Sequence, residues 1–316
     1  MVSIRYAHPP PTVAVIERHT YDLHLLRNGT HDPTTRVSIS PAAHVQHARI
    51  QRATLTPQGA GTIQIDIHTD ANGARLHEVR SWGPGGDWLA GNHLRLAAHT
   101  TDCTPLTPHH PAVTRALRDY GQLHLPATDT PYHELLPAIL GQRITAAQAL
   151  TQWVRLCEHF GETAPGPLSL RLPPMPERLL QIASWEFHQL GIEEQRARAL
   201  RVAARQARYI DATREVSGAQ ARESLMRLPG IGVWTAAVTV GVSHGDPDAL
   251  PIGDFHVKNT VAWALTGRAR GTDEAMLHTL APYAGQRWQV VRLLEKSGLG
   301  APKFGPRRRL IDIARI

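Results

Sequence analysis

Cysteine and lysine are scarce in this sequence, and it has no long apolar run. Only Cys103 and Cys157 are present, which is too few for a disulfide framework or for an iron–sulfur cluster held by four cysteines. No apolar run approaches the roughly 20 residues that span a bilayer. The N-terminus also lacks the charged start and apolar core of a signal peptide. We therefore expect a cytoplasmic protein with no membrane partner and no iron–sulfur cofactor.

The charges are unevenly distributed along the 316 residues. The formal net charge is +7, with 34 Lys and Arg against 27 Asp and Glu. Residues 1–105 hold nine basic and eight acidic side chains, whereas residues 106–316 hold 25 and 19. A basic surface attracts polyanions, so the second part of the chain is the better candidate for binding one. The 19 histidines show no spacing typical of a metal site, and we interpret them as scattered surface residues.

The first part of the chain predicts an antiparallel β-rich domain over residues 1–104. Residues 62–68 alternate apolar and polar side chains, and Asn72 and Gly73 are typical of a turn. Residues 75–80 then form the second strand of the hairpin. This pattern is typical of a hairpin with one buried face. Further strands are expected at 13–16, 21–25 and 48–55.

The second part, residues 105–316, follows a proline-rich linker and predicts an all-α domain. The fold class is therefore α+β, with the two kinds of structure in separate domains. One expected helix, 196–208, carries an arginine stripe on one face, which is either a solvated face or a phosphate track. Its members are Arg198, Arg201, Arg205 and Arg208. Helices are expected at 112–120, at 132–140, from the segment 141–145 to 159, at 196–208, within 219–242, at 254–265 and at 283–294.

A short hairpin between two helices is the most distinctive motif of the chain. Residues 225–236 read Leu-Met-Arg-Leu-Pro-Gly-Ile-Gly-Val-Trp-Thr-Ala. Pro229 ends the first helix, and Gly230 and Gly232 allow positive φ and close approach of another backbone. The amides that begin the second helix then point outward and form an anion site.

An aspartate follows the hairpin at a distance of 22 residues. Asp254 lies after Gly253 and begins a helix, so its simplest role is an N-cap. A helix N-terminus also favours the carboxylate form. A fixed carboxylate can stabilise the positive charge that develops on a sugar when its glycosidic bond breaks.

Together these motifs resemble the helix-hairpin-helix DNA glycosylase superfamily, whose mark is this hairpin followed by a catalytic aspartate. The sequence is most similar to the 3-methyladenine glycosylases II, which share Pro-Gly-Ile-Gly-x-Trp-Thr-Ala and Asp-aromatic-x-x-Lys. The similarity extends roughly from Pro105 to the C-terminus. It implies base excision repair of double-stranded DNA that contains damaged bases, by a monomer associated with the nucleoid.

The resemblance assigns roles to individual residues. Asp254 is implied as the catalytic residue, and Trp234 and Phe255 as the walls of the base pocket. Arg143 matches the residue that wedges into the duplex, although the bacterial prototype has an aliphatic side chain there. The implied DNA contacts are Gly230, Ile231, Gly232, Thr235, Gln142 and Arg143. The main-chain carbonyls of Met226, Leu228 and Ile231 are implied as ligands of a monovalent cation, Na⁺ or K⁺.

The reaction implied is hydrolysis without a lyase step. Lyase-competent relatives carry a lysine where this chain has Trp234, and Lys258 matches a structural lysine of the family. The motif supplies no second acid to protonate a departing base, which favours purines already made cationic by alkylation. Two alternatives stay open: excision of another damaged base such as an oxidised purine, and a non-catalytic protein that binds damaged DNA.

Overall fold

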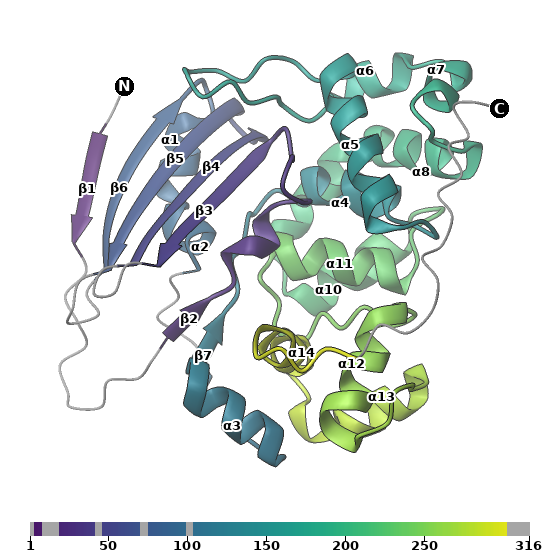
Figure 1. Cartoon of the computed structure of the whole chain (residues 1–316). Helices are drawn as coiled ribbons and strands as arrows, with labels where there is room; N and C mark the ends of the chain where they lie inside the picture. Colours follow the sequence, from purple (N-terminus) through teal and green to yellow (C-terminus); the bar gives the residue numbers. More distant parts are fainter. Residues whose placement is uncertain (1–2, 8–18, 42–45, 70–74, 99–103, 302–316) are drawn as a thin grey trace.

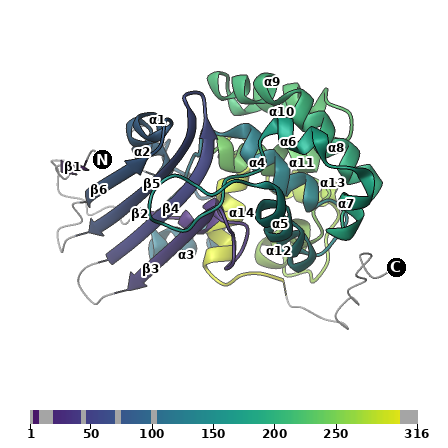
Figure 2. The ribbon, with the colours of Figure 1, turned by 90° about the horizontal axis from the view of Figure 1, so that it is seen from above.

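The computed structural model describes residues 3–7, 19–41, 46–69, 75–98 and 104–301. A twisted antiparallel sheet lies beside a larger helical body (Figure 1 and Figure 2). The expected α+β class is confirmed, with the strands of the sheet first in the chain and the helices of the large body after them. Among the described residues, no helix is both long and apolar enough to cross a membrane.

The sheet is formed by five strands in the order β1-β6-β5-β4-β3. The alternation in the sequence places Ile50, Ile65 and Val79 side by side across three strands, where all three are buried. Two short helices, α1 (Gly86–Gly91) and α2 (His93–Leu96), follow the last strand of this sheet. Their Leu89 and Leu96 side chains are part of this core. The strands are β1 (Ser3–Ala7), β3 (Thr35–Pro41), β4 (Gln46–Thr56), β5 (Gly59–Thr69) and β6 (Arg75–Trp82).

Three of the expected strands, 48–55, 62–68 and 75–80, are thereby confirmed. The expected strand at 13–16 and the Asn72-Gly73 turn lie outside the described residues. The strand expected at 21–25 was wrong. The chain forms β2 (His19–Tyr21) and then turns into a 3₁₀ helix, Leu23–Leu26, because the Leu25 amide donates to the Asp22 carbonyl.

The strand β2 connects the first part of the chain to the helical body. It pairs in parallel with β7 (Gln122–His124), about 100 residues later. Leu25 packs against a helical core, and Asp22 accepts a hydrogen bond from Arg292 at 2.8 Å. Part of the predicted N-terminal domain is therefore built into the helical one.

The helical body has two hydrophobic cores. One surrounds Leu136, Trp153 and Leu200, and the other surrounds Val261 and Val290. Its helices are α3 (Pro111–Tyr120), α4 (Pro131–Leu140), α5 (Ala146–Phe160), α6 (Pro176–Gln181), α7 (Ser184–Gln189), α8 (Glu194–Arg205), α9 (Ala207–Ala212), α10 (Gly218–Met226), α11 (Val233–Ser243), α12 (Phe255–Thr266), α13 (Asp273–Thr279) and α14 (Arg287–Lys296).

The last helix begins later than the sequence pattern predicted. The chain at Ala281–Tyr283 forms a 3₁₀ turn, and Gly285 then adopts a φ of 89°. The Asp248 carboxylate accepts hydrogen bonds from the amides of Gly285 and Arg287 at 3.0 Å each. This distant cap fixes the start of α14 at Arg287.

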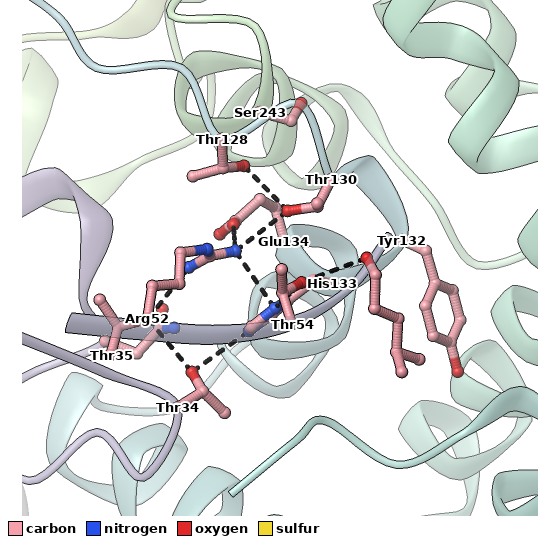
Figure 3. A network of polar contacts seen from close by, with 12 residues as sticks. Thr34, Thr35, Arg52, Thr54, Thr128, Thr130, Tyr132, His133, Glu134 and Ser243 are labelled. Carbon is pink, nitrogen blue, oxygen red and sulfur yellow. Dashed lines mark hydrogen bonds and ion pairs between the residues drawn. The ribbon is translucent and has the colours of Figure 1, made fainter. Parts of the chain in front are cut away.

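A buried polar network joins the sheet to α4 (Figure 3). Arg52 on β4 pairs with Glu134 at 2.5 Å and donates to Thr130 at 3.0 Å. His133 is 1% exposed, so the interpretation of the histidines as surface residues was wrong for it. Its Nδ1 lies 2.8 Å from the Thr54 hydroxyl. Burial raises the pKa of Glu134, although Arg52 opposes it. Burial, with the Arg52 charge, holds the pKa of His133 well below its usual value.

This network orients α4 relative to the sheet. Breaking one partner of a buried ion pair leaves an uncompensated charge, which costs about 3–5 kcal/mol. The helix α4 ends at Leu140, and only one residue separates it from Gln142 and Arg143. The sheet thereby helps to fix the predicted wedge segment in place.

Candidate active site

The hairpin joins α10 to α11 through residues 227–232. Gly230 has a φ of 85°, and a Cβ there would lie 3.0 Å from the Cβ of Ala199 on α8. Ile231 is buried, and its amide donates to the Leu228 carbonyl at 3.1 Å. Gly232 is exposed and serves as the N-cap of α11.

The surface at Gly232 is open. A Cβ built there would meet no atom within 4 Å. The first amides of an α-helix have no acceptor within the helix, and those of α11 follow this exposed glycine. The hairpin therefore has the geometry of the anion site that the sequence predicts.

The predicted wedge segment lies on the hairpin. The Gln142 amide donates to the Gly230 carbonyl and to the Thr235 hydroxyl, both at 2.9 Å. Thr235 is only 2% exposed. The side chains of Gln142 and Thr235 thus contact each other in this structure, and their DNA contacts stay a prediction. Arg143 is exposed and has a φ of 62°, a conformation that residues other than glycine seldom adopt.

Asp254 caps α12 and is held at both carboxylate oxygens. Its Oδ1 accepts hydrogen bonds from the amides of His256 at 2.7 Å and Val257 at 3.0 Å. Its Oδ2 accepts one from the indole Nε1 of Trp234 at 2.9 Å. The side chain is partly buried. The structure therefore brings the predicted catalytic carboxylate and the predicted pocket aromatic into direct contact.

Asp273, which the sequence motifs did not indicate, fixes the turn before Asp254. Its Oδ1 accepts the Gly253 amide at 2.9 Å, and its Oδ2 pairs with Lys258 Nζ at 3.0 Å. Burial acts to raise the pKa of Asp273, but these two donors outweigh it and the pKa lies below its usual value. Lys258 is engaged in this ion pair. Asp273 is the first residue of α13, 15 positions after Lys258, and gave no local sequence signal.

Phe255, the second predicted pocket residue, is 59% exposed. The Arg270 guanidinium lies 5.3 Å from its ring centroid, and the His256 ring packs against it edge-on at 5.3 Å. The aromatic face of Phe255 thus already contacts one cation.

A second carboxyl group lies within the electrostatic reach of Asp254. Glu295 on α14 is partly buried and pairs with Arg292 at 2.5 Å. Burial raises its pKa, Arg292 opposes this, and the negative charges of Asp22 and Asp254 raise it further. The sequence gave no reason to select this glutamate, because only the packing of α12 against α14 brings it near.

The predicted cation ligands lie at the first turn of the hairpin. Met226 is the last residue of α10, and the Leu228 carbonyl already accepts the Ile231 amide. A carbonyl oxygen has two lone pairs, so Leu228 keeps one for an ion. The monovalent cation stays a prediction.

Residues 136–283 match the family described as HhH-GPD superfamily base excision DNA repair protein. This segment contains the wedge segment, the hairpin, Asp254 and Asp273. The helical part of the chain is thus similar to this superfamily over 148 of the 316 residues. No curated protein sequence gave a significant match.

Solved structures of DNA glycosylases are similar over most of this chain. A 3-methyladenine DNA glycosylase from Archaeoglobus fulgidus aligns with a TM-score of 0.63 and 15% identity, covering 94% of this chain and 98% of the other. The Clostridium acetobutylicum 8-oxoguanine glycosylase/lyase with double-stranded DNA has a TM-score of 0.54 and 11% identity, over 84% and 99%. The Schizosaccharomyces pombe 3-methyladenine DNA glycosylase Mag1 with abasic DNA has a TM-score of 0.51 and 18% identity, over 60% and 92%.

Proposed function

We propose that this protein is a monofunctional DNA glycosylase that excises alkylated purines of the 3-methyladenine type by hydrolysis. The observation that carries the proposal is the Asp254 carboxylate, fixed by two helix amides and by the Trp234 indole. A protein that only bound DNA would gain nothing from a fixed negative charge near phosphates. The partner is a DNA duplex that contains a damaged base.

Binding begins at the hairpin. The α11 amides beyond Gly232 take a backbone phosphate, which requires no side chain and reads no sequence. Gln142 fixes the neighbouring segment to this hairpin through Gly230. Arg143, exposed at the tip of that segment, enters the stack when the damaged nucleotide leaves it. The target base must leave the duplex because no side chain reaches its glycosidic bond inside it.

Asp254 then supports the departure of the base. As the bond to C1′ breaks, positive charge develops on the sugar, and the carboxylate stabilises it and orients the attacking water. An N3- or N7-alkylated purine leaves readily because it already carries a positive charge. The electron-rich face of the Trp234 ring suits such a cation. Lys258 is bound to Asp273, which supports a reaction without a Schiff-base intermediate.

A second candidate function is the excision of a neutral damaged base such as an oxidised purine. One observation favours it: burial, with the Asp22 and Asp254 charges, raises the pKa of Glu295. A raised pKa keeps a larger fraction of a carboxyl group protonated, so that it can donate a proton to a leaving group. This function predicts that Glu295→Gln slows excision of the neutral base, whereas the first predicts no dependence of alkylpurine release on Glu295.

The test is excision from duplexes that each carry one defined lesion: 3-methyladenine, 7-methylguanine or 8-oxoguanine. The proposal predicts release of the alkylated purines, intact abasic sites that break only after alkali, and no covalent adduct after borohydride treatment. Strong release of 8-oxoguanine without release of alkylpurines would favour the second candidate. A borohydride-trapped adduct would contradict hydrolysis and identify Lys258 as the nucleophile to test.

A further inference from the structure

The arginine stripe of α8 and α9 divides into two parts in the structure. Arg198 pairs with Glu194 at 2.8 Å. Arg201 donates to the Ser184 hydroxyl at 3.1 Å, and its guanidinium lies 4.9 Å from the Phe187 ring centroid. These two arginines are therefore used inside the helical domain. The remaining members, Arg205 and Arg208, are exposed.

Arg205 lines a concave surface that the hairpin completes. A cavity of about 390 Å³ lies between the end of α8 and the first residues of the hairpin. Its apolar part is formed by Val202, Leu228 and Pro229, and its polar part includes Arg205 and Arg227. We call this cavity the hairpin pocket.

The hairpin pocket is positively charged. Neither Arg205 nor Arg227 has an ion-pair partner within the described part of the chain, and both side chains are exposed. A guanidinium stays protonated in proteins and matches a phosphate with two parallel N–H donors. Tyr209, whose hydroxyl lies 3.3 Å from the Ser224 carbonyl, forms another wall. A sugar phosphate fits this lining, because its phosphate can pair with the arginines and the C–H groups of its sugar can pack on the apolar side chains.

The pocket adjoins the predicted phosphate site. Pro229 lines it and precedes Gly230, and consecutive Cα atoms are 3.8 Å apart. The helix α8 also lies against the hairpin, because its Ala199 is close to Gly230. Nucleotides of one strand rise 3.4 Å per residue. Because phosphates recur at this spacing along the duplex axis, a strand with one phosphate on the α11 amides can present another to the nearby pocket.

We propose that the hairpin pocket binds a second backbone phosphate of the DNA, held by Arg205 and Arg227, and so lengthens the footprint along one strand. This inference rests on DNA binding at the hairpin, which is part of the proposed function. It does not require base excision, and its test measures binding to an undamaged duplex. A failure of the excision assay therefore leaves this test intact.

The first experiment compares Arg205→Ala and Arg227→Ala with Arg208→Ala. Arg208 is exposed but does not line the pocket. Arg208→Ala therefore removes one positive charge, as the pocket variants do, without changing the pocket. Each neutralised phosphate contributes about 0.9 to the slope of log affinity against log salt. We expect each pocket variant to weaken binding and to lower that slope by at most about 0.9, because the two arginines share one phosphate, while Arg208→Ala changes neither. Equal effects of all three variants, or none, would overturn the proposal.

The second experiment locates the phosphate. Duplexes with a single uncharged methylphosphonate at successive positions are bound to the wild type and to Arg205→Ala. One position should weaken binding to the wild type and have no further effect on the variant. Strictly additive losses at every position would contradict the proposal and favour an acidic protein segment as the ligand of the pocket. All substituted arginines are exposed, so thermal unfolding should match the wild type.

Discussion

The indole nitrogen of Trp234 donates a hydrogen bond to Oδ2 of Asp254 at 2.9 Å. The two residues are 20 positions apart, on the first turn of α11 and at the N-cap of α12. The sequence predicts a wall of the base pocket at Trp234. The structure adds a second role, because the same side chain fixes the orientation of the predicted catalytic carboxylate.

Replacing Trp234 with phenylalanine separates these two roles. The Trp234→Phe variant keeps an aromatic wall but loses the donor to Asp254. A hydrogen bond to a charged group contributes about 1.5–3 kcal/mol, so we expect single-turnover excision to slow about tenfold to a hundredfold. Duplex binding should stay unchanged. Normal excision by Trp234→Phe, with a loss only in Trp234→Ala, would reduce Trp234 to a pocket wall.

The two hairpin glycines should respond differently to substitution. Gly232→Val places its side chain in open space and should leave the unfolding temperature unchanged while it blocks close approach of a phosphate. Affinity should fall for all DNA sequences alike, because phosphate contacts carry no sequence information. Gly230→Val combines a φ of 85° with a contact to Ala199, so this variant should also lose stability. Unchanged affinity in Gly232→Val would move the DNA surface elsewhere.

Arg143 offers a matched pair of variants for the wedge. Both Arg143→Ala and Arg143→Gly remove the side chain, but only glycine relieves the left-handed backbone at φ 62°. Both should slow excision from a stable base pair more than from a mismatch, because a mismatch has already lost part of the few kcal/mol of unpairing energy. Arg143→Gly should unfold at a higher temperature than Arg143→Ala. Equal slowing on both substrates would make Arg143 a simple phosphate contact.

Local patterns predicted the parts of this protein that depend on neighbouring residues. The alternation of apolar and polar residues at 62–68 indicated a strand, and the glycines indicated the hairpin. Both signals are local, because the first is the two-residue period of a strand and the second is the backbone freedom of glycine. The strand predicted at 21–25 failed because the pairing with β7 ends at Asp22, where the Leu25 amide bonds back to the Asp22 carbonyl and turns the chain into a 3₁₀ helix.

The same limit applies to the candidate site. Asp254 could be selected because it follows the hairpin at a recognisable distance. Asp273 and Glu295 could not, because their positions relative to Asp254 depend on the packing of α13 and α14 against α12. The Arg52–Glu134 pair likewise joins residues 82 positions apart, and neither one belongs to a motif.

The buried His133 predicts a pH dependence of stability. Its folded-state pKa lies well below 6.5, so the unfolded chain takes up a proton near pH 6.5 that the folded protein does not bind. The contribution of His133 to the free energy of unfolding is therefore fully present above pH 6.5. It falls at lower pH, by up to about 1.4 kcal/mol per pH unit. His133→Gln should show a shallower fall of the unfolding free energy between pH 6.5 and 5. Parallel curves for the two proteins would contradict the lowered pKa.

The most direct test of the central claim is single-turnover release of 7-methylguanine from a duplex by the wild type and by Asp254→Asn. Asparagine keeps the shape of the side chain and the helix cap but removes the charge. We predict release by the wild type, no measurable release by the variant, and equal or tighter duplex binding, because the variant no longer repels phosphates. Near-normal release by Asp254→Asn would contradict the assignment of Asp254 as the residue that stabilises the transition state.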